Sequence, residues 1–314
     1  KLMYKIKNIV IFYPSFERGG ATQNLINLIN YFLKLNIHVY LITKNINSKK
    51  LFYNKKITIL SPQKNKGYKI INNRIITGFF SIFYLIKILN KINLNCSVIL
   101  SMQSSFFSVV ASFFFNIKNI VRVSEDPCGA TKYADNYIFA FFILLTKVFT
   151  YNFSDKIIVN SIKSKNCVEK FVFTKKKVNL VYNAYINKIS KNSNKLRKNY
   201  ILSVGRICKQ KNQLNLILAF KLFLKKFKNY KLIICGDGPD KNMLIENVRK
   251  LKLTNKVIFK GWKNNLKKYY KNSKLFVLPS LYEGLPNALI DAVNYDLPSI
   301  STNCSGAKDI LINN

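Results

Sequence analysis

Short runs rich in Val and Ile alternate along the chain with longer segments in which apolar residues recur at helical spacing. Such runs are typical of buried strands in a parallel sheet, and apolar positions three and four residues apart are typical of the helices that cover it. In residues 21–35, for example, Leu25, Leu28, Ile29 and Phe32 share one helical face. The strand-like runs of the first half are residues 8–13, 38–43, 97–101, 120–124, 156–160 and 178–182.

The alternation stops at residues 186–199, which are polar and basic, and restarts at residue 200. Further strand-like runs follow at 200–204, 231–235, 256–260, 274–278 and 299–301. This pattern predicts an α/β protein with two tandem, doubly wound, Rossmann-like domains at 1–185 and 200–314, joined by a linker at 186–199. Sheets of this kind bind ligands at the carboxyl ends of their strands, so we expect the site in the cleft between the domains.

Composition adds a large excess of positive charge. The 314 residues include 52 Lys and Arg against 13 Asp and Glu, a net charge of +39, and residues 1–198 hold 32 of the basic and 6 of the acidic residues. Hydrophobic residues make up 49% of the chain, which excludes a disordered protein. The charge indicates polyanionic surroundings: nucleic acid, an anionic membrane surface or phosphorylated substrates.

The cysteines and the longest apolar runs each exclude a class of structure. The six cysteines stand far apart without a Cys-x-x-Cys spacing, which argues against a metal cluster or a disulfide framework and favours a reducing cytosol. The longest apolar runs, residues 78–86 and 137–145, are too short to cross a bilayer. For the Phe-rich segments 79–83 and 113–115, core packing is the more frequent role and membrane anchoring the less frequent one.

Two predicted strand-to-helix junctions suit an anionic ligand. Gly19 and Gly20 let backbone N–H groups approach an anion at a helix N-terminus, although a plain turn explains them equally well. Arg206 and Lys211 follow the first strand of the second half and suit a pyrophosphate, with chance placement as the alternative in so basic a chain. Neither junction has the G-x-G-x-x-G pattern, which argues against a dehydrogenase.

A third junction carries two of the few acids. Glu283 and Asp291 frame a turn and helix start at Gly284 and Pro286. A carboxylate there can hold sugar hydroxyls or stabilise positive charge at an anomeric carbon. The alternative is that Glu283 only complements the helix dipole, and the spacing leaves both open.

Taken together, these segments resemble the family 4 glycosyltransferases, retaining nucleotide-sugar enzymes with two facing Rossmann-like domains (the GT-B architecture). The resemblance is densest in ILSVGRICKQKN, KLIICGDGPDKNML, VIFKGW, LFVLPSLYEGLPNALIDAV and LPSISTNCSGAKDIL, in the family's order and spacing. The first half is similar more loosely, through the Gly19-Gly20 loop and residues 36–43. The resemblance implies that the second domain continues beyond Asn314, so we expect the C-terminal end to be truncated.

The resemblance implies a role for each candidate residue. Glu283 would face the donor sugar, and Asp291, one methylene shorter than the family's glutamate, would bind the ribose hydroxyls. Arg206 and Lys211 match the pair that holds the donor diphosphate, and with Glu283 they are the expected catalytic residues. The remaining donor-binding matches are the two loops that meet sugar and phosphate through their backbones, Gly19, Gly20, Gly284, Leu285, Pro286 and Asn287.

The acceptor side departs from the family. Many relatives carry a histidine near the acceptor, but the sole histidine here, His38, stands at a strand start, where we expect a packing role. Ser101 ends one predicted strand, and Glu125 and Asp126 follow another. These three are the candidates for the acceptor side.

The expected function is that of a retaining glycosyltransferase, cytoplasmic and peripheral at the inner face of the membrane. It would move a hexose or N-acetylhexosamine from a nucleotide-diphosphate sugar, with UDP favoured, to a polysaccharide, lipopolysaccharide or lipid-linked glycan. Expected partners are the donor, the acceptor and an anionic membrane surface, and not nucleic acid. No metal or other cofactor is expected, because the chain lacks a DxD-type cluster and two cations can neutralise the diphosphate.

Two alternatives remain open from the sequence. A basic nucleic-acid-binding protein accounts for the charge, but only 6 of the 52 cations are Arg and no nucleic-acid-binding module is recognisable. The second alternative is an enzyme of the same fold with nucleotide-sugar epimerase or phosphorylase activity. Turnover of a nucleotide sugar that depends on an added acceptor separates these alternatives from transfer.

Overall fold

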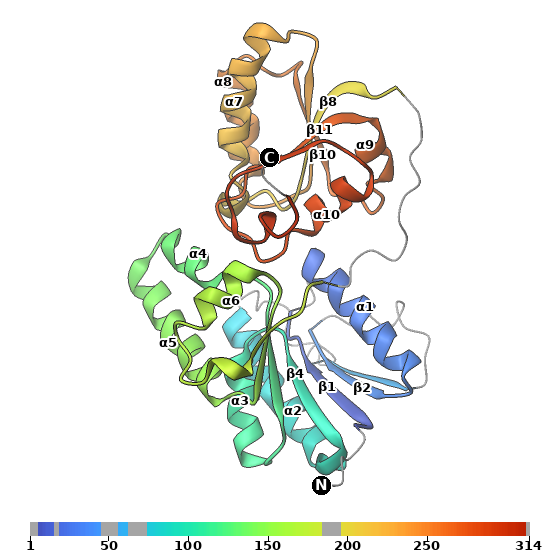
Figure 1. Ribbon diagram of the computed structural model, residues 1–314, viewed down its shortest axis with the longest axis vertical. Coiled ribbons are helices and arrows are strands. Elements are labelled where there is room, and N and C mark those ends of the chain that lie inside the picture. Colours follow the sequence, from blue (N-terminus) through green and yellow to red (C-terminus); the bar gives the residue numbers. More distant parts are fainter. Residues whose placement is uncertain (1–5, 16–18, 45–55, 62–73, 184–195, 312–314) are drawn as a thin grey trace. The chain divides into compact units, whose positions relative to one another are not determined.

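The chain folds into two compact units, Lys1–Ala184 and Tyr185–Asn314, each built on a parallel sheet (Figure 1). The computed structural model describes residues 6–15, 19–44, 56–61, 74–183 and 196–311. The prediction of an α/β chain with two doubly wound sheets is confirmed. Most of the predicted linker, 186–199, lies outside the described residues, and residues 198 and 199 already belong to a strand.

The N-terminal unit has a seven-stranded sheet in the order β3-β2-β1-β4-β5-β6-β7. Its strands are β1 (Asn8–Phe12), β2 (His38–Ile42), β3 (Ile57–Leu60), β4 (Ser97–Ser101), β5 (Asn119–Val123), β6 (Lys156–Val159) and β7 (Val178–Leu180). The strand β3 was not predicted from the sequence, because its four residues, ITIL, are only half-buried at the sheet edge and follow a basic segment.

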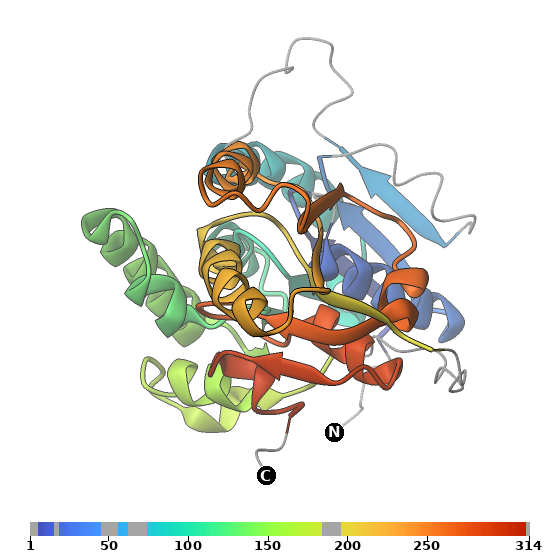
Figure 2. The same ribbon diagram turned by 90° about the horizontal axis from the view of Figure 1, so that it is seen from above.

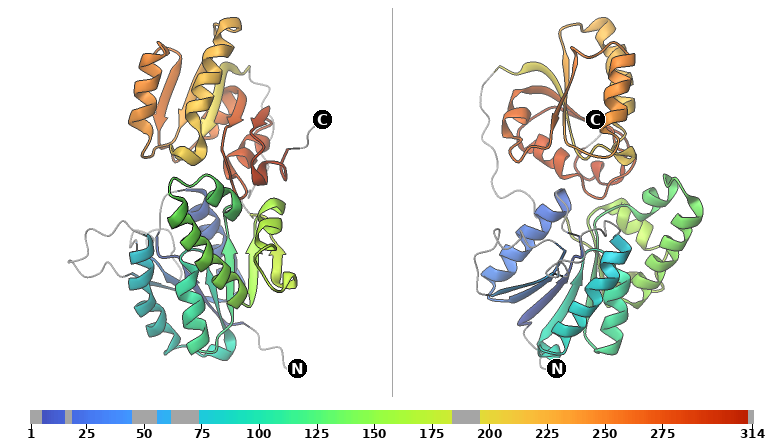
Figure 3. Two further views of the ribbon diagram at one scale, coloured as in Figure 1. Left: turned by 90° about the vertical axis from the view of Figure 1, so that its left-hand side faces the viewer. Right: turned by 180° about the vertical axis from the view of Figure 1, so that it is seen from behind.

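Helices cover both faces of this sheet (Figure 3). They are α1 (Gly20–Lys34), α2 (Arg74–Leu89), α3 (Ser105–Phe114), α4 (Pro127–Lys132), α5 (Tyr137–Phe153) and α6 (Ile162–Val168), with short 3₁₀ turns η3 (Leu94–Cys96) and η4 (Lys175–Lys177). Leu25 and Ile29 of α1 pack on one face. Residues of α2, α3, α5 and α6 pack on the other face. Right-handed crossovers require this division, because the sheet grows from β1 toward β3 on one side and from β1 toward β7 on the other.

The C-terminal unit has a five-stranded sheet in the order β10-β9-β8-β11-β12 (Figure 2). Its strands are β8 (Lys198–Val204), β9 (Lys231–Cys235), β10 (Val257–Gly261), β11 (Ser273–Leu278) and β12 (Ser299–Ser301). One face is covered by α7 (Gln213–Lys226) and α8 (Lys241–Lys250), the other by α9 (Lys267–Asn272) and α10 (Asn287–Asn294). Two 3₁₀ turns, η5 (Lys209–Lys211) and η6 (Ser305–Ala307), complete the unit.

Each sheet has a switch point where the strand order reverses. In the N-terminal unit it lies at β1, between β2 and β4, and in the C-terminal unit at β8, between β9 and β11. Crevices for ligands form at the carboxyl ends of such strands. Gly19 and Gly20 follow β1, and Arg206 and Lys211 follow β8, so the fold puts both predicted anion-binding loops at these positions.

The cysteines differ from the expectation in one respect. A disulfide joins Cys128 in α4 to Cys167 in α6, while Cys96, Cys208, Cys235 and Cys304 are free. The pair is 39 residues apart in sequence and becomes close only because α4 and α6 follow neighbouring strands, β5 and β6. Spacing along the chain therefore gave no sign of it.

We expect Cys128→Ser to lower the free energy of unfolding of the N-terminal unit by about 2–4 kcal/mol in non-reducing buffer, because the disulfide restricts the unfolded chain. Urea denaturation followed by circular dichroism measures this change. Reductant should bring the unsubstituted chain close to the variant. Equal stability of the two chains without reductant would show that Cys128 and Cys167 do not pair.

The Phe-rich segments also differ from the expectation. The side chains of Phe79, Phe83, Phe113 and Phe114 are more than half exposed. We expected core packing as the more frequent role of such segments, and for these four side chains that expectation is wrong. Among the described residues, no helix combines the length and the apolar character needed to cross a membrane.

Candidate functional site

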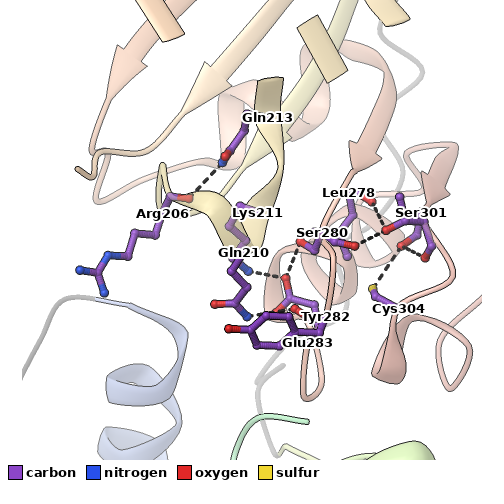
Figure 4. A network of polar contacts seen from close by, with 11 residues as sticks. Arg206, Gln210, Lys211, Gln213, Leu278, Ser280, Tyr282, Glu283, Ser301 and Cys304 are labelled. Atoms are coloured by element: carbon purple, nitrogen blue, oxygen red, sulfur yellow. Dashed lines mark hydrogen bonds and ion pairs between the residues drawn. The ribbon is translucent and has the colours of Figure 1, made fainter. Parts of the chain in front are cut away.

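An ion pair between Lys211 and Glu283 stands at the carboxyl ends of two neighbouring strands (Figure 4). Lys211 ends η5, which follows β8, and Glu283 lies in the loop between β11 and α10, 72 residues further along the chain. The two loops meet because β8 and β11 pair in the sheet. The fold thus brings together two residues that the sequence singled out at separate junctions.

The Glu283 carboxylate is buried, with 6% of the residue exposed. Its Oε1 accepts hydrogen bonds from Lys211 Nζ and, at 2.7 Å, from Ser280 Oγ. A carboxylate withdrawn from water is costly unless a cation and hydrogen-bond donors compensate it, and these two partners do so. Glu283 is therefore a fixed negative charge held at the end of the sheet, and not a freely moving surface acid.

Further hydrogen bonds hold the two loops in register. Leu281 N–H donates to Gln210 O at 2.8 Å, and Gln210 Nε2 donates to Tyr282 O at 2.9 Å. The buried Gln213 donates from Nε2 to Arg206 O at 3.0 Å. Side chains that lock loops in this way keep a binding site in shape before a ligand arrives.

The turn after Glu283 rests directly on the backbone of η6. A Cβ added at Gly306 would stand 2.0 Å from Gly284 O, so only glycine permits this approach. Gly284, Leu285 and Pro286 are buried, and α10 begins at Asn287. Gly306 was not singled out from the sequence. The small-residue run Ser305–Ala307 was the available signal.

We expect Gly306→Ala to destabilise the C-terminal unit by about 1–3 kcal/mol, because the added methyl forces the Gly284 turn to move. The same substitution at Gly19 is the control, since a Cβ there would meet nothing within 4 Å. Thermal unfolding of both variants measures the difference. If Gly306→Ala were as stable as the unsubstituted chain, the close packing of η6 on this turn would be wrong.

Of the other predicted donor-side residues, Arg206 and Asp291 belong to the same unit as this pair, and Gly19 and Gly20 belong to the N-terminal unit. Arg206 is exposed, and its guanidinium extends away from Lys211 and Glu283 (Figure 4). Asp291 lies on α10. The pKa of Tyr295 is raised, mainly by burial and further by the negative charge of the Asp291 carboxylate. Gly19 is the N-cap of α1 and Gly20 its first residue, both exposed, and residues 16–18 lie outside the described residues.

The acceptor-side candidates have three different environments. Asp126 is buried and caps α4, with Oδ1 accepting a hydrogen bond from Cys128 N–H at 3.1 Å. Glu125 is exposed and pairs with Lys147 Nζ at 2.9 Å. Ser101 is fully buried, and its Oγ has no hydrogen-bond partner within the described part of the chain.

His38 has the packing role expected of it. Its Nε2 lies 2.9 Å from Thr58 Oγ1 on the neighbouring strand, and its ring centroid lies 4.5 Å from that of Tyr40, with the two rings tilted. Burial, and then the charge of Lys56, lower the pKa of this imidazole. The neutral ring is therefore favoured at the start of β2.

One buried cation of the N-terminal unit was missed from the sequence. Arg122 in β5 is 9% exposed, and its Nη2 donates to Asn183 Oδ1 at 2.8 Å. Its Nε is buried without a partner in the described ranges, and burial lowers the pKa of the guanidinium. The signal was an arginine inside an otherwise apolar strand, NIVRV.

The described residues contain one group of three possible metal ligands, Asp126, Cys128 and Cys167. Two of its ligand atoms are the sulfurs of the disulfide. It lies in the N-terminal unit, away in sequence from the Lys211–Glu283 pair.

Comparison with known proteins places these features in a family. Residues 186–314 match the family model described as glycosyl transferases group 1. An uncharacterized glycosyltransferase of Methanocaldococcus jannaschii is 38% identical over 209 residues, which cover 62% of this chain and about half, 51%, of that relative. An N-acetylgalactosamine-N,N'-diacetylbacillosaminyl-diphospho-undecaprenol 4-alpha-N-acetylgalactosaminyltransferase of Campylobacter jejuni is 26% identical over 316 residues, covering 97% of this chain and 83% of that one.

Among solved structures, HepE of Anabaena in complex with UDP and glucose aligns with a TM-score of 0.77. The alignment covers 98% of this chain and 83% of HepE at 15% identity. A likeness at this level of identity concerns the fold, and it confirms the predicted GT-B fold.

Proposed function

Because the chain belongs to the group 1 glycosyl transferases, we propose that it moves a hexose or N-acetylhexosamine from a UDP-sugar to a lipid-linked glycan, with retention at the anomeric carbon. The observation that carries this proposal is the ion pair between Lys211 and the buried Glu283 at the switch point of the C-terminal sheet. The pair places a lysine that can bind a diphosphate beside a carboxylate that can bind or stabilise a sugar.

The donor diphosphate is proposed to bind at the loop after β8. Lys211 Nζ has three N–H donors, so it can keep Glu283 and still donate to a phosphate oxygen. The exposed Arg206 offers a bidentate fork from the same loop. Backbone N–H groups of Gly284, Leu285 and Asn287, and of Gly19 and Gly20, complete the proposed donor contacts beside the Pro286 turn. Asp291 is proposed to take the ribose hydroxyls.

Glu283 is proposed to face the donor sugar. In the proposed step, the bond between the anomeric carbon and the phosphate oxygen breaks while the acceptor oxygen bonds to the same carbon from the same face. The acceptor's hydroxyl proton passes to the departing phosphate oxygen. The Glu283 carboxylate then stabilises positive charge on the sugar, and Arg206 and Lys211 stabilise negative charge on the leaving diphosphate.

On the acceptor side, Glu125 is the exposed carboxylate and Ser101 the hydroxyl without a partner in the described ranges, and both lie at carboxyl ends of strands. We assign Glu125 to orienting the acceptor hydroxyl, because Ser101 is fully buried and does not reach a bound acceptor. Asp126 keeps its part in capping α4. The acceptor is proposed to be presented at the cytoplasmic face of an anionic membrane, which suits 27 basic against 6 acidic residues in positions 1–184.

The test is to incubate the chain with a panel of nucleotide sugars, with and without an undecaprenyl-diphosphate-linked glycan, and to measure release of UDP or GDP. UDP release that requires the acceptor, and that a chelator leaves unchanged, is expected. Conversion of the sugar without acceptor would instead indicate an epimerase. Absence of nucleotide release with every donor would contradict the proposal.

A further inference from the structure

Three helices form a continuous layer on one face of the N-terminal sheet. In Figures 1 and 3, α2, α3 and α5 lie side by side there. Ring contacts join them: Phe79 with Phe107 across α2 and α3, and Phe106 with Phe149 across α3 and α5. The three helices therefore pack against one another as one layer.

All three helices of this layer carry large apolar side chains that are exposed. We call six of them the aromatic face, each more than half exposed: Phe83, Phe114, Tyr137, Ile138, Phe141 and Phe142. In residues 137–145 of α5, Ala140 is the one buried residue. In α5, four of these residues, Tyr137, Ile138, Phe141 and Phe142, lie within two turns of one helix. A water-soluble surface rarely carries so many apolar groups so close together, and such patches mark contact with a protein or a membrane.

Charge indicates which contact this face suits. The helices α2, α3 and α5 contain no Asp or Glu, and their charged residues are Arg74, Lys87 and Lys147. The unit that carries them has a net charge of +21, from 27 basic and 6 acidic residues in positions 1–184. A second copy of the chain would bring like charges together, whereas an anionic lipid surface complements both the charge and the apolar side chains.

We propose that the aromatic face docks onto an anionic lipid bilayer, with the first half of α5 lying in the headgroup region. This rests on the proposed function only in that the same membrane would present the acceptor. Aromatic side chains and lysines on a helix surface are suited to the interface between lipid and water. Attachment then has an apolar part that resists salt and an electrostatic part that salt screens.

Docking of α5 also reaches the proposed acceptor side. Lys147 of α5 pairs with Glu125, which follows β5, at 2.9 Å. The helix that contacts lipid is therefore tied by a side chain to the end of β5. A lipid-linked acceptor held in the bilayer would be delivered beside this strand end.

Co-sedimentation with vesicles tests the proposal. The chain is mixed with vesicles of phosphatidylcholine and phosphatidylglycerol in low salt and in about 0.5 M salt, which screens charges that are more than about 4 Å apart. We expect partial binding to persist in high salt, and Phe141→Ser/Phe142→Ser to weaken the partition coefficient about tenfold in both. The matched control is Leu218→Ser/Leu222→Ser, two exposed apolar residues of α7 in the other unit, which should bind like the unsubstituted chain.

Circular dichroism establishes that each variant is folded, and size-exclusion chromatography reports self-association. Loss of all binding in high salt, or equal binding of the Phe141/Phe142 variant, would overturn the proposal. A dimer that the two Phe substitutions dissociate would show that a second copy covers the face instead. Turnover of a water-soluble acceptor should be equal in both double variants, so failure of lipid docking is distinguishable from failure of the proposed transfer activity.

Discussion

Glu283→Gln should lower the rate of sugar transfer by about 10²–10³-fold, the size expected when a charge that stabilises the transition state is removed. Glutamine keeps the shape of the side chain, and its amide oxygen can still accept from Ser280 Oγ and Lys211 Nζ. UDP affinity should therefore change by less than about threefold. Initial rates with saturating donor and acceptor, together with calorimetric titration of UDP, separate these two effects.

The matched control for this substitution is Glu246→Gln on α8, an exposed acid of the same unit. It should turn over like the unsubstituted chain. Transfer by Glu283→Gln at the unsubstituted rate would remove Glu283 from the reaction. Equal loss in both variants would indicate a general effect of charge.

Lys211→Met should weaken UDP binding by about 10- to 150-fold, which corresponds to the roughly 1.5–3 kcal/mol of a hydrogen bond to a charged group. It should also destabilise the C-terminal unit by about 1–3 kcal/mol, because Glu283 loses its cation while it stays buried. Arg206→Ala should weaken UDP binding similarly without the loss of stability, because Arg206 is exposed. Calorimetry and urea denaturation measure the two quantities.

The double variant Lys211→Met/Glu283→Gln tests the origin of that instability. It should recover most of the stability lost in Lys211→Met, because the unpaired buried charge is gone. Lys209→Met, in the same 3₁₀ turn but exposed, is the control and should keep both stability and UDP affinity. Unchanged UDP affinity in both Lys211→Met and Arg206→Ala would contradict the assignment of the diphosphate to this loop.

The strand pattern was readable from the sequence because parallel strands buried on both faces are short, continuous apolar runs. β3 was missed for the converse reason, since a half-buried edge strand lacks that signal. Glu283 and Lys211 were identified individually, but their pairing across 72 residues follows from the β8–β11 contact, which no local pattern encodes. Ser280 and Gln210 belong to the same network and were not singled out, because single polar residues in loops are common.

The exposure of α5 illustrates a different limit. Its apolar residues occur all round the helix, and periodicity then cannot tell a helix buried on every side from one that presents an apolar surface to another phase. Only the arrangement of α2, α3 and α5 on one sheet face shows which side is uncovered. The Cys128–Cys167 disulfide is similar, since it depends on which strands are neighbours.

Amide hydrogen exchange measured with and without UDP tests the donor site directly. UDP should slow exchange in two peptides that are far apart in sequence, the loop after β8 around residues 205–213 and the loop before α10 around residues 280–288. The strand ends of the N-terminal unit at Ser101 and Glu125 should be unaffected until an acceptor is added. Protection confined to other segments, at UDP concentrations where calorimetry detects binding, would contradict a donor site built on Lys211 and Glu283.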